Sequence, residues 1–466
     1  MVSFLPLTYS HSHCELHRPN RQACLSISCR VNLETGAGCA CSQLASSYPD
    51  QILFPHSADY TTQAINYWDA RSELRPACIF LPSSADQVSD GIGLFSKCGA
   101  QFGYPGSNNI YGGVLLALDS SMDYRFGNET ITVRSGMTWN DVYSALEPYG
   151  RVAVGGRLKT IEVPGLMLIG GVSYLSNKYR SAMDNVVDYE VVLGNGTKIT
   201  ASATSHPDLF WTLKGGANNF AVVTIFRLQT FSMPYISMTI QQFNETGIYV
   251  LVRASCDLVL VDDDASTAAG VVLTITYNVT AFRASEVILS VQEGISNRPS
   301  RFANFTAIPG TSKQWASNLD SPKQMFRIVF GNHSMYPDAD VFYSMFKTWT
   351  AAVAQTADIQ GLYPTFVINL SPASAASVVK TNQIGNTWGL SEEPLICKCR
   401  CQVTTGWDHH LVEHRHANNK RNGLARAFIY MGFPAENVQR MRDIRQIYDP
   451  SGTFPRLNWG GFKLGY

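Results

Sequence analysis

The sequence Gly165-Leu-Met-Leu-Ile-Gly170-Gly171-Val-Ser173, followed by Asp184-Asn-Val-Val187, gives the strongest indication of the fold. Glycine lets a backbone adopt positive φ angles and approach another group closely. Converging N–H groups in a glycine-rich loop can bind the phosphates of a nucleotide. Taken alone, each glycine is more typical of an ordinary turn than of a phosphate-binding loop. The order of the surrounding elements has to distinguish these two interpretations.

On both sides of this stretch, residues 72–232 alternate between short strands and helices. The Gly194-Asn-Gly-Thr197 turn predicts a β-hairpin between residues 189–193 and 198–201, because an Asn-Gly pair fits a tight turn. Helix starts are predicted from capping boxes at Ser83-Ser-Ala-Asp86, Thr138-Trp-Asn-Asp141 and Ser205-His-Pro-Asp208. The helix that begins at Ser205-His-Pro-Asp208 should end at Gly215-Gly216, before a strand over residues 220–231.

From about residue 233 the pattern changes. Residues 235–243 and 270–277 predict half-buried strands. Residues 340–354 predict an amphipathic helix with Val341, Met345, Trp349 and Val353 on one face. A last helix should run from Ala435 to the stop at Asp449-Pro450. Residues 1–40 show no periodicity and are predicted to be an irregular N-terminal segment.

Composition limits the possible functions. The 466 residues carry a formal net charge of zero, and charged residues make up 15%, against roughly 25% in average domains. The chain has no excess of basic residues that would indicate a nucleic-acid partner. No run approaches the ~18 apolar residues of a membrane span, so no nucleic acid and no membrane span are expected.

Two signals about localisation conflict. The N-terminus lacks the apolar region of a signal peptide. Yet seven asparagines begin N-x-[ST] triplets, which indicates a glycosylated protein of the secretory pathway: Asn128, Asn195, Asn244, Asn278, Asn304, Asn332 and Asn369. The eleven cysteines cannot be paired from spacing alone.

Several further motifs join the glycine-rich stretch in a fixed order. They are Tyr67-Trp68, Arg75-Pro-Ala-Cys78-Ile79, Gly155-Gly156-Arg157, Glu190-Val-Val-Leu193, Asp208-Leu-Phe-Trp211 with Lys214-Gly215-Gly216, Tyr448-Asp-Pro450 and Gly460-Gly-Phe-Lys463. In this order the chain resembles the fungal berberine-bridge-enzyme-like proteins, a group of oxygen-dependent FAD-linked oxidoreductases.

The resemblance implies an α+β fold. A PCMH-type (VAO-like) FAD-binding domain would span residues 41–232 and be completed by 434–466. An antiparallel-sheet substrate domain, 233–433, would cover the isoalloxazine ring. Cys41 and Cys78 become candidates for a disulfide on the same basis.

The resemblance also implies the site. FAD would be the cofactor, a small organic molecule of fungal secondary metabolism would be the substrate, and molecular oxygen would be the electron acceptor. The implied cofactor-binding residues are Gly106, Ser107, Asn108, Gly155, Gly156, Gly165, Gly170, Gly171, Asp184 and Val187. Tyr430 is the candidate catalytic residue, because its strand often faces the flavin in the family; the alternative is a core tyrosine. The alternative function is a non-catalytic or weakly flavin-bound paralogue acting as a binding protein.

The chain departs from the family at several points. Gly103 runs almost directly into Tyr104-Pro105-Gly106, so the loop whose histidine links covalently to the flavin is missing, and FAD should be bound non-covalently. The sequence Glu162-Val-Pro164 replaces a glycine-rich pattern. Proline removes an N–H donor, and the Glu162 charge would repel the pyrophosphate by about 1–4 kcal/mol. Arg180 is either a compensating phosphate partner or a solvated arginine.

A second motif indicates a chemistry other than flavin binding. His410-Leu-Val-Glu413-His414 matches a zinc-peptidase pattern, and Cys397, Cys399 and Cys401 lie nearby. The surrounding sequence favours a polar irregular loop, so no metal is predicted.

Overall fold

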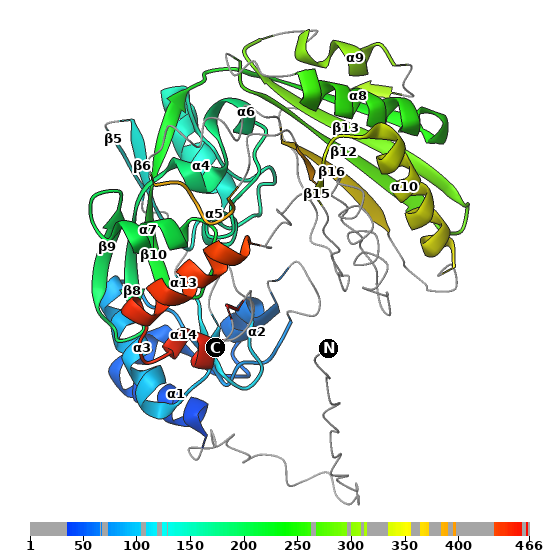
Figure 1. Cartoon of the computed structure of the whole chain (residues 1–466). Helices are drawn as coiled ribbons and strands as arrows, with labels where there is room; N and C mark the ends of the chain where they lie inside the picture. Colours follow the sequence, from blue (N-terminus) through cyan, green and yellow to red (C-terminus); the bar gives the residue numbers. More distant parts are fainter. Residues whose placement is uncertain are drawn as a thin grey trace, which may run out of the picture.

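A computed structural model describes residues 35–65, 67, 73–103, 109–118, 124–127, 129–261, 267–295, 300–308, 312–314, 334–355, 364–371, 384–389, 395–397, 433–458 and 463–464. Three sheets organise these residues, each with its own helices (Figure 1). Within the described ranges, every helix is too short or too polar to cross a bilayer.

The first sheet is small and mixed. Its strands, in order across the sheet, are β1 (Ile52–Leu53), β2 (Cys78–Phe80), β4 (Val114–Leu116) and β3 (Phe102–Gly103). Parallel strands need a crossover, and α3 (Ala85–Cys98) supplies it between β2 and β3. Phe80, Phe95 and Phe102 fill the core beneath α1 (Gly36–Ser47), and α2 (Ala58–Ile65) packs beside β2.

Helix α1 corrects the prediction of an irregular segment over residues 1–40. The helix begins at Gly36, and the Thr35 side chain caps it by accepting a hydrogen bond from the N–H of Gly38 at 3.0 Å. Disulfides Cys39–Cys98 and Cys41–Cys78 tie α1 to α3 and β2. The second disulfide confirms the expected pair. These cross-links explain why a segment without helical periodicity is helical.

The second sheet is antiparallel. Its strands are β5 (Tyr124–Gly127), β6 (Thr130–Arg134), β10 (Ala221–Ser232), β8 (Val186–Leu193) and β9 (Lys198–Ser202), with β7 (Arg151–Ala153) also paired to β10. The predicted hairpin is confirmed by the register Val192↔Lys198. In its turn, Asn195 Oδ1 accepts from the N–H of Thr197 at 2.9 Å, and Gly196 has a φ of 84°.

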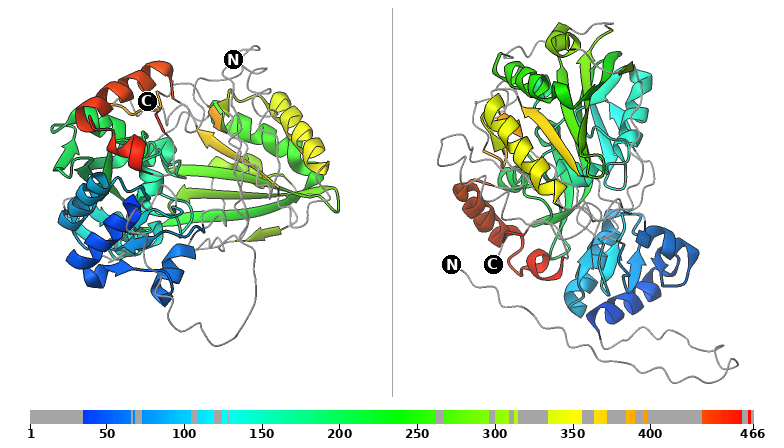
Figure 2. Two further views of the ribbon diagram at one scale, coloured as in Figure 1. Left: turned by 90° about the horizontal axis from the view of Figure 1, so that it is seen from below. Right: turned by 90° about the vertical axis from the view of Figure 1, so that its right-hand side faces the viewer.

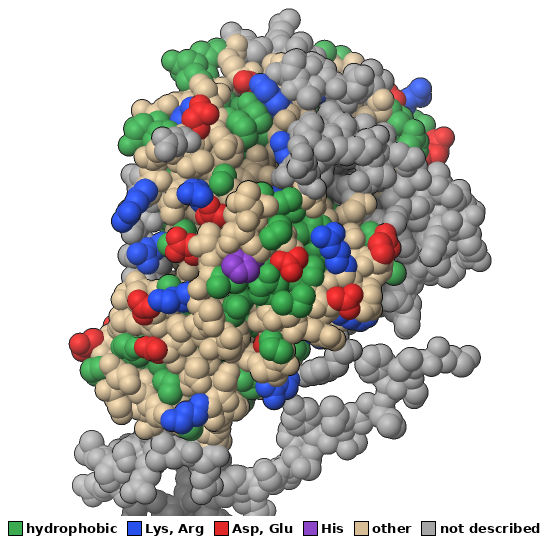
Figure 3. Space-filling view, turned by 60° about the vertical axis from the view of Figure 1, so that its left-hand side comes forward, with side chains coloured by type: hydrophobic (Ala, Val, Ile, Leu, Met, Phe, Trp, Pro, Cys, Tyr) green, Lys and Arg blue, Asp and Glu red, His purple; other side chains and the backbone are tan. Residues whose placement is uncertain are grey.

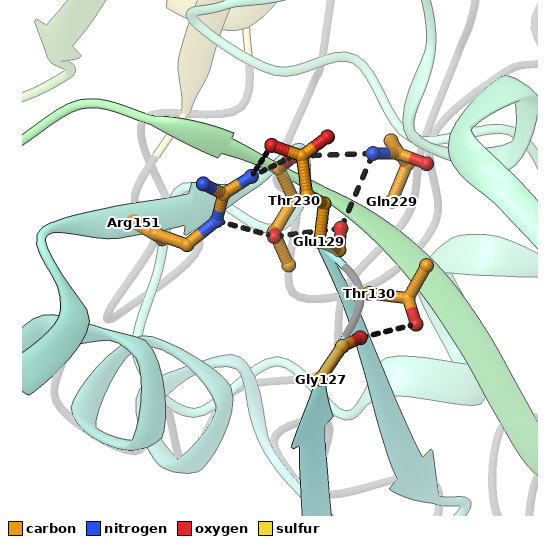
Figure 4. Close-up of polar contacts among 6 residues, drawn as sticks. All are labelled: Gly127, Glu129, Thr130, Arg151, Gln229 and Thr230. Atoms are coloured by element: carbon orange, nitrogen blue, oxygen red, sulfur yellow. Dashed lines mark hydrogen bonds and ion pairs between the residues drawn. The ribbon is translucent and has the colours of Figure 1, made fainter.

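A polar cluster holds the edge of this sheet (Figure 4). Arg151 donates from Nε to Thr230 Oγ1 at 2.8 Å and from Nη2 to the Thr230 carbonyl at 2.9 Å. Thr230 Oγ1 in turn donates to the carbonyl of Glu129, in the β5–β6 turn, at 2.8 Å. The cluster therefore fixes β7, β10 and that turn relative to one another.

Helix starts follow the predicted capping boxes only in part. Thr138 and Asp141 form the predicted box at α4 (Trp139–Leu146). At α3 the cap is Ser84, one residue later than predicted. At α7 (Pro207–Leu213) the Ser205 prediction is wrong: His206 is the N-cap residue, in left-handed conformation, and no side chain caps the helix.

The third sheet is the large antiparallel one. Its strands are β14 (Ser312–Gln314), β11 (Ile236–Asn244), β13 (Arg283–Glu293), β12 (Ala269–Asn278), β16 (Thr365–Ser371), β17 (Leu395–Cys397) and β15 (Ser334–Met335). Helices α8 (Ile248–Val261) and α10 (Ala339–Ala354) cover one face, and the rest of the molecule lies toward the other (Figure 2). Met345, Trp349 and Val353 of α10 are buried as predicted.

The C-terminal segment returns to the first half of the chain (Figure 1). Met441 and Ile444 of α13 (Ala435–Tyr448) pack into the core of the second sheet, and Phe454 of α14 (Thr453–Leu457) packs into the core of the first. The Tyr448 hydroxyl donates to Asp208 Oδ1 at 2.7 Å. On the face shown in Figure 3, acidic and basic side chains are interspersed, in line with the zero net charge.

Candidate active site

The glycine-rich stretch forms a tight turn between α5 (Val163–Met167) and α6 (Ser176–Tyr179). Gly170 and Gly171 have φ angles of 127° and 81°. Their carbonyls accept from the N–H groups of Met183 at 2.9 Å and Ala182 at 2.8 Å. The N–H groups of Gly170, Gly171 and Val172 have no hydrogen-bond partner among the described residues. A turn held by its carbonyls with its amides available can bind an anion.

Aromatic rings explain why glycine is required at these positions. A Cβ atom at Gly170 would lie 1.7 Å from the Trp388 ring. At Gly155 and Gly156, a Cβ would lie 1.9 and 2.5 Å from the ring of Trp139. Thus the Gly155–Gly156 pair packs against the first turn of α4, and a direct role in cofactor binding stays a prediction.

The start of α5 carries the departures noted in the sequence. Pro164 stands in its first turn and offers no N–H, and Gly165 follows it. Glu162 is the N-cap residue but makes no capping hydrogen bond. Its side chain is reached by water, yet desolvation by the surrounding protein raises the pKa of its carboxyl group. Desolvation likewise raises the pKa of Tyr67, and the nearby Glu162 charge adds to this rise.

The predicted residues Asp184 and Val187 directly follow Ala182 and Met183, which hydrogen-bond to the glycine turn. Asp184 is buried, and its Oδ1 accepts from Asn386 Nδ2 at 2.9 Å. Burial raises the pKa of this carboxyl group in spite of the neighbouring Lys214 charge. Burial likewise lowers the pKa of Lys214 to about 8. Val187, together with Arg180 and Asp184, lines a hollow of about 410 Å³.

This arrangement divides the predicted site residues. Gly170, Gly171 and Asp184 are joined through residues 182–183, whereas Val187 faces the hollow beside Arg180. Gly106, Ser107, Asn108 and Tyr430 lie outside the described residues, as do the histidines of the possible zinc site. In the part of the chain that is described, no three His, Cys, Asp or Glu side chains group to hold a metal ion.

A contact between the first half and the large sheet was not predicted. Arg157 Nη1 donates to Asn369 Oδ1, on β16, at 2.7 Å across 212 residues of sequence. The Arg157 guanidinium carbon lies 5.7 Å from the ring centroid of Tyr174. Arg157 and Tyr174, together with Gly270 and Leu370, line a cavity of about 30 Å³. Asn369 carried a signal in the sequence only as a glycosylation triplet, so this junction could not be anticipated.

A second contact lies beside the first. Lys178 Nζ contacts Glu293 Oε2, on β13, at 2.8 Å, and the same oxygen accepts from the N–H of Ala268 at 2.9 Å. Asn177 Nδ2 donates to the Thr267 carbonyl at 2.8 Å. These five residues, on α6 and at the ends of β12 and β13, thus hold the segment after the glycine turn against the large sheet.

Comparison with known proteins agrees with this geometry. Residues 76–202 match the model of an FAD binding domain. The chain is 27% identical to the FAD-dependent monooxygenase prx3 of Penicillium roqueforti, over 91% of this chain and 93% of that protein. It is 30% identical to an uncharacterized FAD-linked oxidoreductase of Arthroderma benhamiae, over 77% and 75%. The solved structure of Physcomitrella patens BBE-like 1 superposes with a TM-score of 0.71 at 15% identity, covering 89% and 97%.

The fold and the site therefore define an FAD-binding oxidoreductase with an α+β fold of the VAO type. The chain belongs to the FAD-linked oxidoreductases, its fold is that of the berberine-bridge-enzyme-like proteins, and FAD is its cofactor. The available amides of residues 170–172 fit the negatively charged cofactor, whereas Glu162 and Pro164 oppose it. We expect the first group to hold FAD and the second to weaken its binding.

Proposed function

We propose that this enzyme oxidises a small organic molecule bound where the glycine turn meets the large sheet, and that molecular oxygen reoxidises the cofactor. The observation that carries the proposal is the junction itself. Available amides at 170–172 adjoin Tyr174, which packs on Gly270 of β12, near the Arg157–Asn369 hydrogen bond. When bound, FAD would supply the hydride-accepting chemistry. The protein's own residues bind, orient and partly dehydrate the reactants.

The substrate class is proposed to be a fungal secondary metabolite. The likeness to an FAD-dependent monooxygenase of Penicillium roqueforti supports this proposal. The cavity of about 30 Å³ near Arg157 holds only one small group, so the rest of the substrate would extend along the open face.

Purified protein tests the proposal. The expected result is a yellow protein whose flavin absorbance bleaches anaerobically with substrate and returns on admitting oxygen, with release of hydrogen peroxide. A folded sample that takes up no FAD under saturating titration would contradict the enzyme proposal. If the substrate reduces the flavin but only an artificial acceptor reoxidises it, the proposal of oxygen as the electron acceptor would be contradicted and the rest would stand.

We further propose that the protein enters the secretory pathway. Asn195, Asn244, Asn278 and Asn304 are exposed, and disulfides of the kind that join α1 to α3 and β2 are typical of oxidising compartments. Asn369 differs, because its side chain is half-buried and bonded to Arg157. Treating protein from a fungal host with an N-glycosidase should lower its apparent mass; an unchanged mass, with all sequons unmodified, would contradict the proposal.

A further inference from the structure

We propose that Arg157, Tyr174 and Asn369 form a binding site for an anionic oxygen of the substrate: a carboxylate, a phenolate or an enolate. This inference rests on the proposed function, since it assigns the substrate class of the same site. It starts from the position of Arg157 between the glycine turn and β16.

The backbone at Arg157 is held firmly in place. Gly155 and Gly156 lie against the Trp139 ring so closely that neither position has room for a Cβ. The Tyr143 hydroxyl donates to the Gly156 carbonyl at 2.8 Å. Because two contacts fix the residues before it, the Arg157 side chain extends from a rigid backbone, as a preorganised binding group requires.

The charge of Arg157 is not neutralised by the described residues. Among the described residues, its one hydrogen bond goes to the neutral amide of Asn369, and its guanidinium also lies over the ring of Tyr174. No carboxylate of the described ranges forms an ion pair with it. A guanidinium group has five N–H donors in a fork that matches carboxylate geometry. Donors therefore remain for a ligand at a half-buried position.

Tyr174 adds a second polar group to the same place. Its hydroxyl has no hydrogen-bond partner among the described residues. Desolvation raises the pKa of this phenol, while the Arg157 charge lowers it. A protonated Tyr174 can thus donate to the same anionic oxygen that the guanidinium binds.

The local space sets the size of the bound group. A Cβ at Gly270 would lie 2.4 Å from the Tyr174 carbonyl oxygen, so glycine is needed for this close approach of turn and sheet. The cavity of about 30 Å³ beside them is lined by Arg157, Ser173 and Tyr174. Such a volume is about that of one water molecule. It suits a single oxygen-bearing group at one end of a substrate.

Asn369 has the role of positioning Arg157. Its amide oxygen is the acceptor that directs one arm of the guanidinium, which leaves the other arm for the ligand. As a glycosylation site the same side chain would instead have to lie free in solvent. Two variants separate these roles: Asn369→Ala removes the amide, and Ser371→Ala removes the N-x-[ST] triplet while keeping the amide.

The test uses the FAD-loaded enzyme and two probes of similar shape, benzoate and the neutral benzamide. Binding is followed by perturbation of the flavin absorbance and, independently, of tryptophan fluorescence. We expect benzoate to bind the natural protein more tightly than benzamide. Arg157→Gln should weaken benzoate binding by ~10-fold or more, the size expected for hydrogen bonds to a charged group. Arg157→Lys should keep part of the preference, because it keeps the charge.

Matched controls make each outcome decisive. Benzamide binding should be the same in all variants, Asn369→Ala should weaken benzoate binding less than Arg157→Gln, and Ser371→Ala should leave it unchanged. Equal binding of both probes to the natural protein, or an unchanged benzoate preference in Arg157→Gln, would overturn the inference. 4-Nitrophenolate as a third probe separates a phenolate from a carboxylate site. Loss of FAD from the natural protein would instead defeat the proposed function, and the flavin spectrum reports that directly.

Discussion

Lys178 and Glu293 join the glycine turn to the large sheet through a contact of 2.8 Å, and both side chains are about three-quarters buried. Glu293 Oε2 also accepts from the N–H of Ala268. Because the contact sits at the edge of the candidate active site, it couples the stability of the turn to the position of the sheet.

Glu293 should make the protein less stable in acid. Desolvation acts to raise the pKa of this carboxyl group, but the hydrogen bonds from Ala268 and Lys178 together hold it below its usual value. A carboxyl group whose pKa is depressed by folding stabilises the fold above its unfolded pKa of about 4.3, and this stabilisation is lost as the pH falls through the folded pKa.

Glu293→Gln should therefore lower the free energy of unfolding by about 1–2 kcal/mol at neutral pH, and less in acid. Denaturant unfolding at several pH values measures this. Asp86→Asn is the control, because its ion pair with Lys198 is largely exposed and should contribute under about 0.5 kcal/mol. An effect of Glu293→Gln that is equally large at the acid end would contradict the coupling.

Removing the Glu162 charge should strengthen FAD binding. Glu162 lies at the N-cap of α5 without a capping bond, where a negative charge repels a pyrophosphate. Glu162→Gln should tighten FAD by roughly tenfold. Since desolvation raises the pKa of Glu162, mild acid should tighten binding in the natural protein and not in the variant. FAD titration of apoprotein, with exposed Glu190→Gln as control, checks both points; weaker binding by Glu162→Gln would refute them.

FAD should leave the protein on acid denaturation. The loop that carries the linking histidine in related proteins is missing between Gly103 and Gly106, so no covalent bond to the flavin is expected. After precipitation with trichloroacetic acid, the yellow colour should remain in the supernatant. Colour that stays with the pellet would show a covalent link through some other residue.

Gly170 should not tolerate a side chain. A Cβ there would overlap the Trp388 ring, and its φ of 127° is unfavourable for other residues. Gly170→Ala should cost at least about 2 kcal/mol of stability or abolish FAD uptake. Gly93→Ala on α3 is the matched control, because a Cβ there meets nothing within 4 Å; it should be neutral or stabilising by up to about 1 kcal/mol. Thermal unfolding and flavin content measure both, and equal behaviour of the two variants would contradict the packing argument.

Local patterns predicted most elements well. The Asn195-Gly196 hairpin, the Thr138–Asp141 capping box, and helices α10 and α13 all appear where the sequence indicated them. Each depends on groups within a few residues, such as a positive φ at glycine or a side chain that reaches a nearby N–H. The Ser205 box does not form: His206 is the N-cap residue, and Asp208 accepts instead from Tyr448, 240 residues away.

The sequence by itself determined the family, the cofactor and the order of strands and helices, since these follow from short motifs in a fixed order. Only the tertiary structure decided that Arg157 meets Asn369, that Trp139 and Trp388 fill the space beside the glycines, and that Glu293 holds Lys178. These contacts join residues far apart in the chain. Their geometry depends on how whole sheets pack, which no local pattern of residues encodes.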